Sequence, residues 1–247
     1  MKVFGKVALV VAIGLSVGVA SAAENSAMDP VWKGEAELGV VATRGNTRTQ
    51  TVSGKASATT DRTQWRHLIK LEALTTAARD KATGEDNTTA ERYGLSGKSD
   101  YKFTEHDYAF GALNYESDRF TGFDYRSSEV LGYGRRILNN ADLTLDAEAG
   151  PGARQSKPKS GSTDNEMVFR VSGNLAWKLS KTATFTEEVS ADIGEVVTIS
   201  KSTTSLKAQV AGSLAMKVSL VVKHVSSVPA GVNKTDAETA LTLVYSY

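Results

Sequence analysis

The chain ends in Asp236-Ala237-Glu238-Thr239-Ala240-Leu241-Thr242-Leu243-Val244-Tyr245-Ser246-Tyr247, a stretch that alternates in polarity almost throughout. One face would carry Ala237, Thr239, Leu241, Leu243, Tyr245 and Tyr247, and the other face would carry the residues between them. Alternation with a period of two indicates a β-strand. Terminal residues of a domain usually fray unless a sheet or a docking site holds them. A pattern that continues to the last residue therefore predicts a strand paired within a sheet.

This terminal strand resembles the carboxy-terminal assembly signal of bacterial outer-membrane β-barrels, with an aromatic last residue and aromatic or leucine residues at alternate positions before it. The resemblance implies that Leu241, Leu243, Tyr245 and Tyr247 form the assembly signal. It also implies two partners, which are the barrel assembly machinery during biogenesis and the lipid of the outer membrane afterwards.

The other end of the sequence has the layout of a secretory signal peptide. Lys2 and Lys6 precede an apolar run over residues 7–20, and small residues fill positions 20–23. We expect cleavage after Ala22 or Ala23, which makes residues 1–22 the signal peptide and residues 23–247 an outer-membrane barrel domain. An anchor helix is the weaker alternative, because the apolar run of 14 residues is shorter than the roughly 20 that span a bilayer.

Composition excludes several classes of protein. Without Lys2 and Lys6, the 29 basic residues become 27 against 28 acidic ones, a formal charge of −1. Such a balance gives no basic stripe for nucleic acid. The absence of cysteine excludes a disulfide framework. No apolar stretch after residue 23 is long enough for a transmembrane helix, but the alternating faces of a membrane barrel average to this kind of hydropathy.

The whole chain after the leader divides into alternating segments. They alternate less clearly in the second, fifth and sixth segments, so ten or fourteen strands remain open, and both faces of the fifth are apolar, which leaves its register unassigned. The twelve expected strands are residues 32–43, 47–60, 64–76, 88–103, 107–117, 125–138, 142–150, 166–179, 183–194, 203–212, 216–225 and 236–247.

The connections between these segments alternate in length. Short turns fall near residues 62, 105, 140, 181 and 214, and longer polar loops fall near residues 83, 121, 160, 199 and 230, the longest over residues 151–165. Outer-membrane barrels have short periplasmic turns and longer outside loops. A soluble sandwich is the alternative, but its strands are mostly about 5–6 residues long. We therefore predict an all-β fold, a closed antiparallel transmembrane β-barrel of about twelve strands.

Three stretches carry a resemblance to a known family. They are Trp32-Lys33-Gly34-Glu35-Ala36-Glu37-Leu38-Gly39 followed by Thr43-Arg44-Gly45-Asn46-Thr47, then Gly132-Tyr133-Gly134-Arg135-Arg136, then Gly150-Pro151-Gly152-Ala153-Arg154. The chain resembles the salt-induced outer membrane proteins of Gram-negative bacteria, the YdiY-like group. This resemblance implies an outer-membrane location and suggests an envelope-stress role, but it supplies no catalytic residue.

Charged residues of both signs share the polar face of the expected strands, which would line the lumen. They can form either a pore lining that selects solutes or an interior held by ion pairs, and twelve strands lie between filled and open barrels. Asp100, Glu188, Asp192, Lys207 and Lys217 have the same parity. The candidate lumen charges are Lys33, Glu35, Glu37, Arg66, Lys70, Glu72, Arg92, Lys98, Asp146, Glu148, Arg170 and Lys178.

No residues converge into a recognisable catalytic or cofactor site. His67 and His224 share the parity of apolar residues and fit a membrane interface, while His106 lies in a short turn. No metal-ligand spacing, P-loop or dinucleotide fingerprint occurs, so we expect no cofactor. The favoured function is a structural or weakly conducting barrel and not an enzyme. A narrow diffusion channel is the main alternative, and a lipid or peptide hydrolase is the third.

Overall fold

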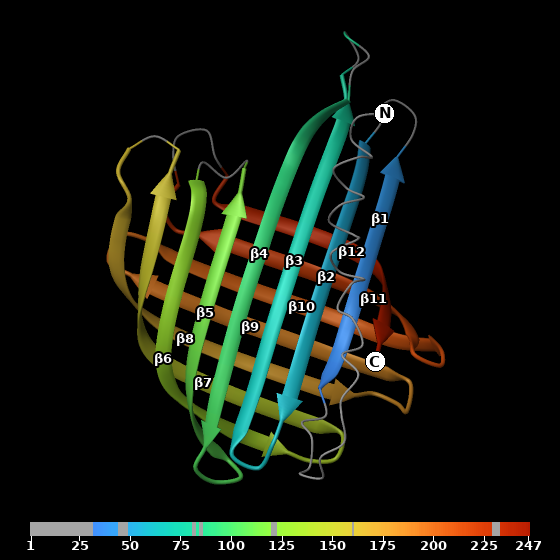
Figure 1. The fold of residues 1–247 in the computed structure, drawn as a ribbon, viewed down its shortest axis with the longest axis vertical. Coiled ribbons are helices and arrows are strands. Elements are labelled where there is room, and N and C mark those ends of the chain that lie inside the picture. The colour runs from blue at the N-terminus through green and yellow to red at the C-terminus, as the bar shows by residue number, and fades with distance from the viewer. Residues whose placement is uncertain are drawn as a thin grey trace, which may run out of the picture.

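The computed structural model describes residues 32–43, 49–80, 83, 86–119, 123–159, 161–228 and 233–247. Its strands close into one antiparallel barrel in which each strand pairs with its sequence neighbours and β1 pairs with β12. The count of twelve strands is confirmed, and Figure 1 shows their arrangement. The strands are β1 (Lys33–Thr43), β2 (Thr49–Asp61), β3 (Trp65–Arg79), β4 (Asp86–Lys102), β5 (Asp107–Asp118), β6 (Phe123–Asn139), β7 (Leu143–Pro158), β8 (Asp164–Lys178), β9 (Ala183–Gly194), β10 (Thr198–Ala211), β11 (Leu214–Val225) and β12 (Thr235–Ser246).

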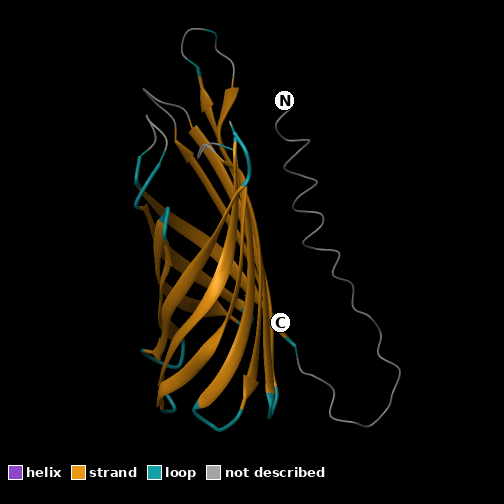
Figure 2. Cartoon of the chain, turned by 90° about the vertical axis from the view of Figure 1, so that its left-hand side faces the viewer, coloured by secondary structure: helices purple, strands orange, loops and turns teal. Residues whose placement is uncertain are grey.

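The barrel has two different ends. Connections of two to four residues join β2 to β3, β4 to β5, β6 to β7, β8 to β9 and β10 to β11 at what we call the turn end, where β12 also ends. The opposite end, the loop end, carries the remaining connections, and the β3–β4 hairpin extends furthest there (Figure 1). Figure 2 shows strands along the whole wall and loops only at its two ends.

The seam between β1 and β12 is the shortest ladder of the barrel. Four residue pairs join β1 to β12, whereas eleven join β1 to β2. Two backbone bonds of 3.0 Å between Gly34 and Tyr247 extend the seam by one pair. The aromatic ring of Tyr247 lies over Gly34, where a Cβ atom would come within 2.1 Å of Tyr247 Cζ. The last residue therefore helps to close the sheet.

Ion pairs between strands that are not neighbours identify the lumen face. Lys70 of β3 meets Glu188 of β9, and Arg92 of β4 meets Glu238 of β12, which is possible only across the interior. The register then assigns every other residue of each strand to the lumen. The opposite parity carries most of the large exposed hydrophobic side chains, including Leu131 at 72% exposure.

The structure resolves the register of β5, which the sequence left open. Tyr108, Phe110 and Ala112 point inward and form a buried cluster with Val130 of β6. On β6, Gly134 lies against the Tyr108 ring and Gly132 against the Phe110 ring, where a Cβ atom would approach to 2.3 and 2.7 Å. These two glycines make the room that two aromatic rings need inside the wall.

Two predicted loops are wrong, because strand pairing continues through polar sequence. Residues 151–165 were expected as the longest loop, yet β7 extends to Pro158 and β8 begins at Asp164. Pro151 lies inside β7, where the β6–β7 ladder is interrupted between the pairs Val130–Gly152 and Tyr133–Ala149. This position suits a residue that has no N–H to donate. Likewise the loop expected near residue 199 shrinks to residues 195–197, because β10 begins at Thr198.

Among the described residues, no helix is long and apolar enough to cross a membrane. The predicted signal peptide, residues 1–22, lies outside the described residues.

Candidate functional site

The lumen is crossed by ion pairs between opposite walls. Lys70 Nζ lies 3.0 Å from Glu188 Oε1, which joins β3 to β9 across half the strands of the barrel. Lys223 of β11 pairs with Glu116 of β5, which again lie six strands apart. In Figure 1 the strands β1–β4 pass in front of β9–β12. These two ion pairs therefore cross the lumen from one wall to the other.

A denser network fills the lumen beside β3–β7. Arg66 Nε donates to Asp100 Oδ2 at 2.6 Å, and its Nη1 reaches Asp146 Oδ2 at 3.3 Å. Arg136 also binds Asp146, with Nε 2.8 Å from Oδ1. Because Asp100 and Asp146 are largely buried and buried carboxylates need paired cations, these arginines balance them.

Glu148 of β7 is the second centre of this network. Tyr108 Oη donates to Glu148 Oε1 at 2.7 Å, Ser172 Oγ donates to Oε2 at 3.2 Å, and Lys98 Nζ also pairs with Glu148. Lys98 lies 5.3 Å from the centre of the Tyr108 ring and Arg66 lies 5.1 Å from it, distances that allow cation–π attraction. This side of the lumen is therefore filled by protein.

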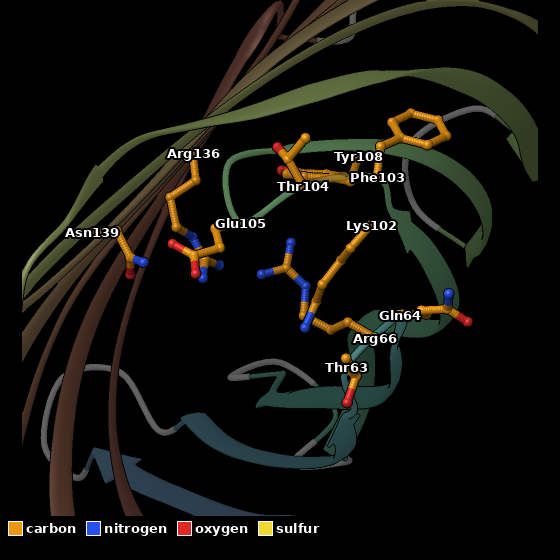
Figure 3. Close-up of a pocket in the computed structure, with 10 residues that line it drawn as sticks. All are labelled: Thr63, Gln64, Arg66, Lys102, Phe103, Thr104, Glu105, Tyr108, Arg136 and Asn139. Atoms are coloured by element: carbon orange, nitrogen blue, oxygen red, sulfur yellow. The ribbon is translucent and has the colours of Figure 1, made fainter.

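A cavity of about 610 Å³ opens at the turn end of β3–β6. Figure 3 shows Arg66, Arg136 and Glu105 directed toward a common space, with Tyr108 beside Thr104 at its edge. Lys102, at the rim, pairs with Asp61 and donates to the carbonyl oxygen of Arg62 at 2.7 Å. The cavity is a mixed-charge mouth of the lumen, and its cations already have partners.

The remaining predicted lumen charges lie on the lumen face, and most have partners. Lys207 pairs with Glu35, and Lys217 Nζ lies 2.8 Å from Glu37 Oε1. Arg92 Nη2 lies 2.6 Å from Glu238 Oε2, and Arg170 Nη2 lies 2.7 Å from Asp192 Oδ2. Lys178 Nζ donates to the Ala141 carbonyl oxygen at 2.9 Å, and the Glu72 side chain lies over Gly94. Lys33 has the lumen parity on β1.

Exposure differs between the two sides of the lumen. The side chains of Asp100 and Glu148 are only 3% and 5% exposed, whereas those of Lys70 and Glu188 are 41% and 49% exposed. Since Lys70 and Glu188 point inward, the solvent that reaches them lies inside the barrel. The lumen is therefore filled along β4–β7 and leaves solvent-accessible space around the Lys70–Glu188 pair, where β3 faces β9 across the interior.

His67 and His224 lie on the outer face, whereas His106 lies in the turn between β4 and β5. His67 Nδ1 lies 2.8 Å from Ser99 Oγ, its ring stacks on Trp65, and His224 Nδ1 lies 2.8 Å from Thr235 Oγ1. Within the described ranges, no carboxylate hydrogen-bonds to either ring, and no group of three His, Asp or Glu side chains is suited to hold a metal ion.

Sequence reasoning missed several lumen residues. Tyr108 and Phe110 were not assigned, because both faces of β5 are apolar. Arg154 lay in the expected loop 151–165 and Glu166 at the first position of the next expected strand, yet their side chains pair across β7 and β8 at 2.7 Å. Polarity alternation cannot show that Tyr108 and Phe110 face the lumen. The glycines opposite them on β6, Gly134 and Gly132, could have indicated it, because they leave room for two aromatic rings.

The predicted assembly signal lies at the outer face of the closing strand. Leu241, Leu243 and Tyr245 share the outward parity of β12, and each is about half exposed. Tyr247 follows the strand, with its ring 6.4 Å from that of Tyr245. Its recognition by an assembly machine stays a prediction.

Comparison with known proteins establishes the family. The family described as "Protein of unknown function, DUF481" matches residues 36–247. The chain belongs to the DUF481 family. This DUF481 protein is also 30% identical over 216 residues to the uncharacterized protein YdiY of Escherichia coli (strain K12), covering 87% of the chain and 83% of YdiY. The resemblance to the YdiY-like group is thereby confirmed.

A solved porin shares the barrel fold of this DUF481 protein. The NanC porin is similar with a TM-score of 0.50 and 8% identity, covering 87% of this chain and 98% of NanC. The translocator domain of the autotransporter NalP from Neisseria meningitidis gives a TM-score of 0.45 and 12% identity, covering all of this chain and 95% of that domain. The closed β-barrel fold class is confirmed.

Proposed function

We propose that this DUF481 protein is an outer-membrane barrel that forms a narrow, water-filled passage for ions and small solutes. The observation that supports the proposal is the half-exposed Lys70–Glu188 pair in the interior. A lumen packed shut would bury this pair, and burial of flexible charged side chains is costly. Closure of the sheet suits a membrane, because lipid offers no partner for an open sheet edge.

The passage would be narrow. The β4–β7 side is filled by the Arg66, Glu148 and Tyr108 network, and two ion pairs cross the rest. Cations and anions are mixed along the wall, so we expect weak selectivity between them. Only small hydrated solutes would pass without displacement of these side chains.

Planar-bilayer recording of the purified protein tests this proposal. We expect a small, stable conductance, and we expect Arg170→Glu to shift its ion selectivity toward cations. A protein that migrates as a folded barrel on unboiled gels but never conducts would contradict the channel.

A structural role in the envelope is the second candidate, and the filled β4–β7 side supports it. The resemblance to the YdiY-like group suggests a role in envelope stress, so the protein would contribute most to growth at high salt. The absence of conductance in planar bilayers, together with salt-sensitive growth of a deletion strain, would favour this role over conduction.

We also propose that the protein is not an enzyme. Two hydroxyls lie beside a histidine, Ser99 beside His67 and Thr235 beside His224, and neither histidine has a carboxylate partner among the described residues. Phospholipid hydrolysis that disappears in the His67→Ala variant would overturn this part of the proposal.

A further inference from the structure

Two arginines lie side by side on the lumen face near the loop end. The register pairs Arg154 of β7 with Ser128 of β6, and pairs Arg126 of β6 with Ser156 of β7. Arg126 and Arg154 are therefore diagonal neighbours on adjacent strands, close enough for long side chains to meet. Each lies within electrostatic range of the other, and like charges at this distance repel.

Arg154 is held rigidly and has one free edge. Its side chain is 3% exposed, and its Nε and Nη2 donate to Glu166 Oε1 at 3.1 and 2.7 Å. Nη2 also donates to the Val197 carbonyl. Glu166 is fixed in turn, because its Oε2 accepts from the backbone N–H of Val196 at 3.1 Å. The remaining nitrogen, Nη1, is buried and has no hydrogen-bond partner among the described residues.

Arg126 is oriented by an aromatic ring and not by a carboxylate. Its guanidinium lies 3.6 Å from the centre of the Phe123 ring, which covers one of its faces and leaves its N–H edges open. Its cross-strand neighbour Glu116 pairs with Lys223 on the far wall. Within the described ranges, Arg126 has no ion pair and donates no hydrogen bond.

A buried arginine donor without an acceptor, such as Nη1 of Arg154, is unusual, and the half-buried Arg126 beside it also lacks an acceptor among the described residues, so the pair points to an absent acceptor. Planar guanidinium groups favour oxyanions, whose oxygens accept two N–H groups at once. Glu116 and Glu166 lie nearby but are engaged with Lys223 and Arg154. We propose that Arg126 and Nη1 of Arg154 bind an oxyanion, a carboxylate or phosphate group of a small solute, near the loop end of the lumen.

Calorimetric titration of the folded protein in detergent micelles tests the site, at fixed pH and ionic strength. Inorganic phosphate and acetate are titrated separately, and the anion that binds identifies the ligand class. We expect saturable binding of at least one, weakened about tenfold in Arg126→Gln, since a lost charge-assisted bidentate contact is worth at least that factor. Arg126→Lys should weaken it less.

Lys201→Gln is the matched control. It removes another inward cation, on β10, which has no ion pair within the described ranges, so it changes the lumen charge equally. We expect its affinity to equal that of the parent protein. No saturable binding of either anion, or equal losses in Arg126→Gln and Lys201→Gln, would overturn the site. Calorimetry detects binding and not conductance, so a protein that does not conduct can still show binding at this site. Migration on unboiled gels shows that each variant is folded.

Discussion

At the scale of single residues, the seam of the barrel depends on contact between the two ends of the described chain. Gly34 is glycine because the Tyr247 ring occupies the space of a side chain. We predict that Gly34→Val displaces this ring and lowers the yield of heat-modifiable barrel, as removal of Tyr247 should.

Gly54→Val on the adjacent strand is the control for this variant. A Cβ atom there would find its nearest neighbour, the Glu37 carbonyl oxygen, at 4.0 Å. Gel mobility before and after boiling, together with protease resistance, measures assembly. Equal yields for Gly34→Val and Gly54→Val would show that the aromatic terminus is incidental to closure.

Tyr108 joins the buried cluster to the charged network, so its truncation should be costly. Tyr108→Ala removes a buried ring, and we expect it to lower the free energy of unfolding by roughly 3–5 kcal/mol. Tyr108→Phe removes only the hydrogen bond to Glu148, which keeps Lys98 and Ser172 as partners, and should cost about 1 kcal/mol. Urea unfolding in lipid vesicles measures both, and equal costs would place the effect in the hydrogen bond.

At the scale of strands, β9 and β10 break the apolar pattern of the outer face. Glu187 has outward parity, and its two oxygens accept from Ser202 Oγ at 2.7 Å and Thr204 Oγ1 at 2.5 Å. These hydroxyls supply the solvation that lipid cannot provide. They explain how a carboxylate is tolerated on a face that otherwise carries Phe185, Val189 and Ile193.

The combined variant Ser202→Ala/Thr204→Val should therefore destabilise the barrel in lipid vesicles by about 1–3 kcal/mol, the cost of an unsatisfied polar group. Adding Glu187→Leu should restore stability, because no carboxylate then remains. Urea unfolding of the three proteins measures this coupling. A double variant as stable as its parent would mean that Glu187 does not need these donors.

How far the strands could be predicted from sequence depended on where their apolar residues lie. Clean alternation located β3, β7 and β8, but it failed at the start of β10, because Thr198, Ser200 and Ser202 put hydroxyls on the outer face. It also failed at the loop end of β7 and β8, where both strands continue beyond their apolar residues and Arg154 of β7 pairs with Glu166 of β8. Periodicity identified which charges face the lumen, but their partners depend on the path of distant strands around the barrel.

At the scale of the whole molecule, the short turns should lie on the periplasmic side. A tag inserted next to Lys159, between β7 and β8, should be labelled on intact cells. A tag next to Lys181, between β8 and β9, should be labelled only after the outer membrane is opened. The opposite labelling pattern would reverse the orientation of the barrel.

The cross-lumen pairs link the shape of the barrel to its conductance. Lys70 and Glu188 meet from opposite walls and are half exposed, so water weakens their attraction and the side-chain entropy lost in pairing offsets much of it. Lys70→Ala should therefore raise conductance, with little loss of stability, because an exposed ion pair contributes about 0–1 kcal/mol.

The exchange Lys70→Glu with Glu188→Lys provides the decisive comparison. It restores attraction across the same gap, so its conductance should return to the parent value, whereas Lys70→Glu alone sets two carboxylates against each other and should conduct most, with preference for cations. Bilayer recordings across a range of salt should also show the parent protein approaching Lys70→Ala as the pair is screened. If all four proteins conduct alike, the narrowest point of the lumen lies elsewhere, and the filled β4–β7 side with its Glu148 network becomes the part that limits passage.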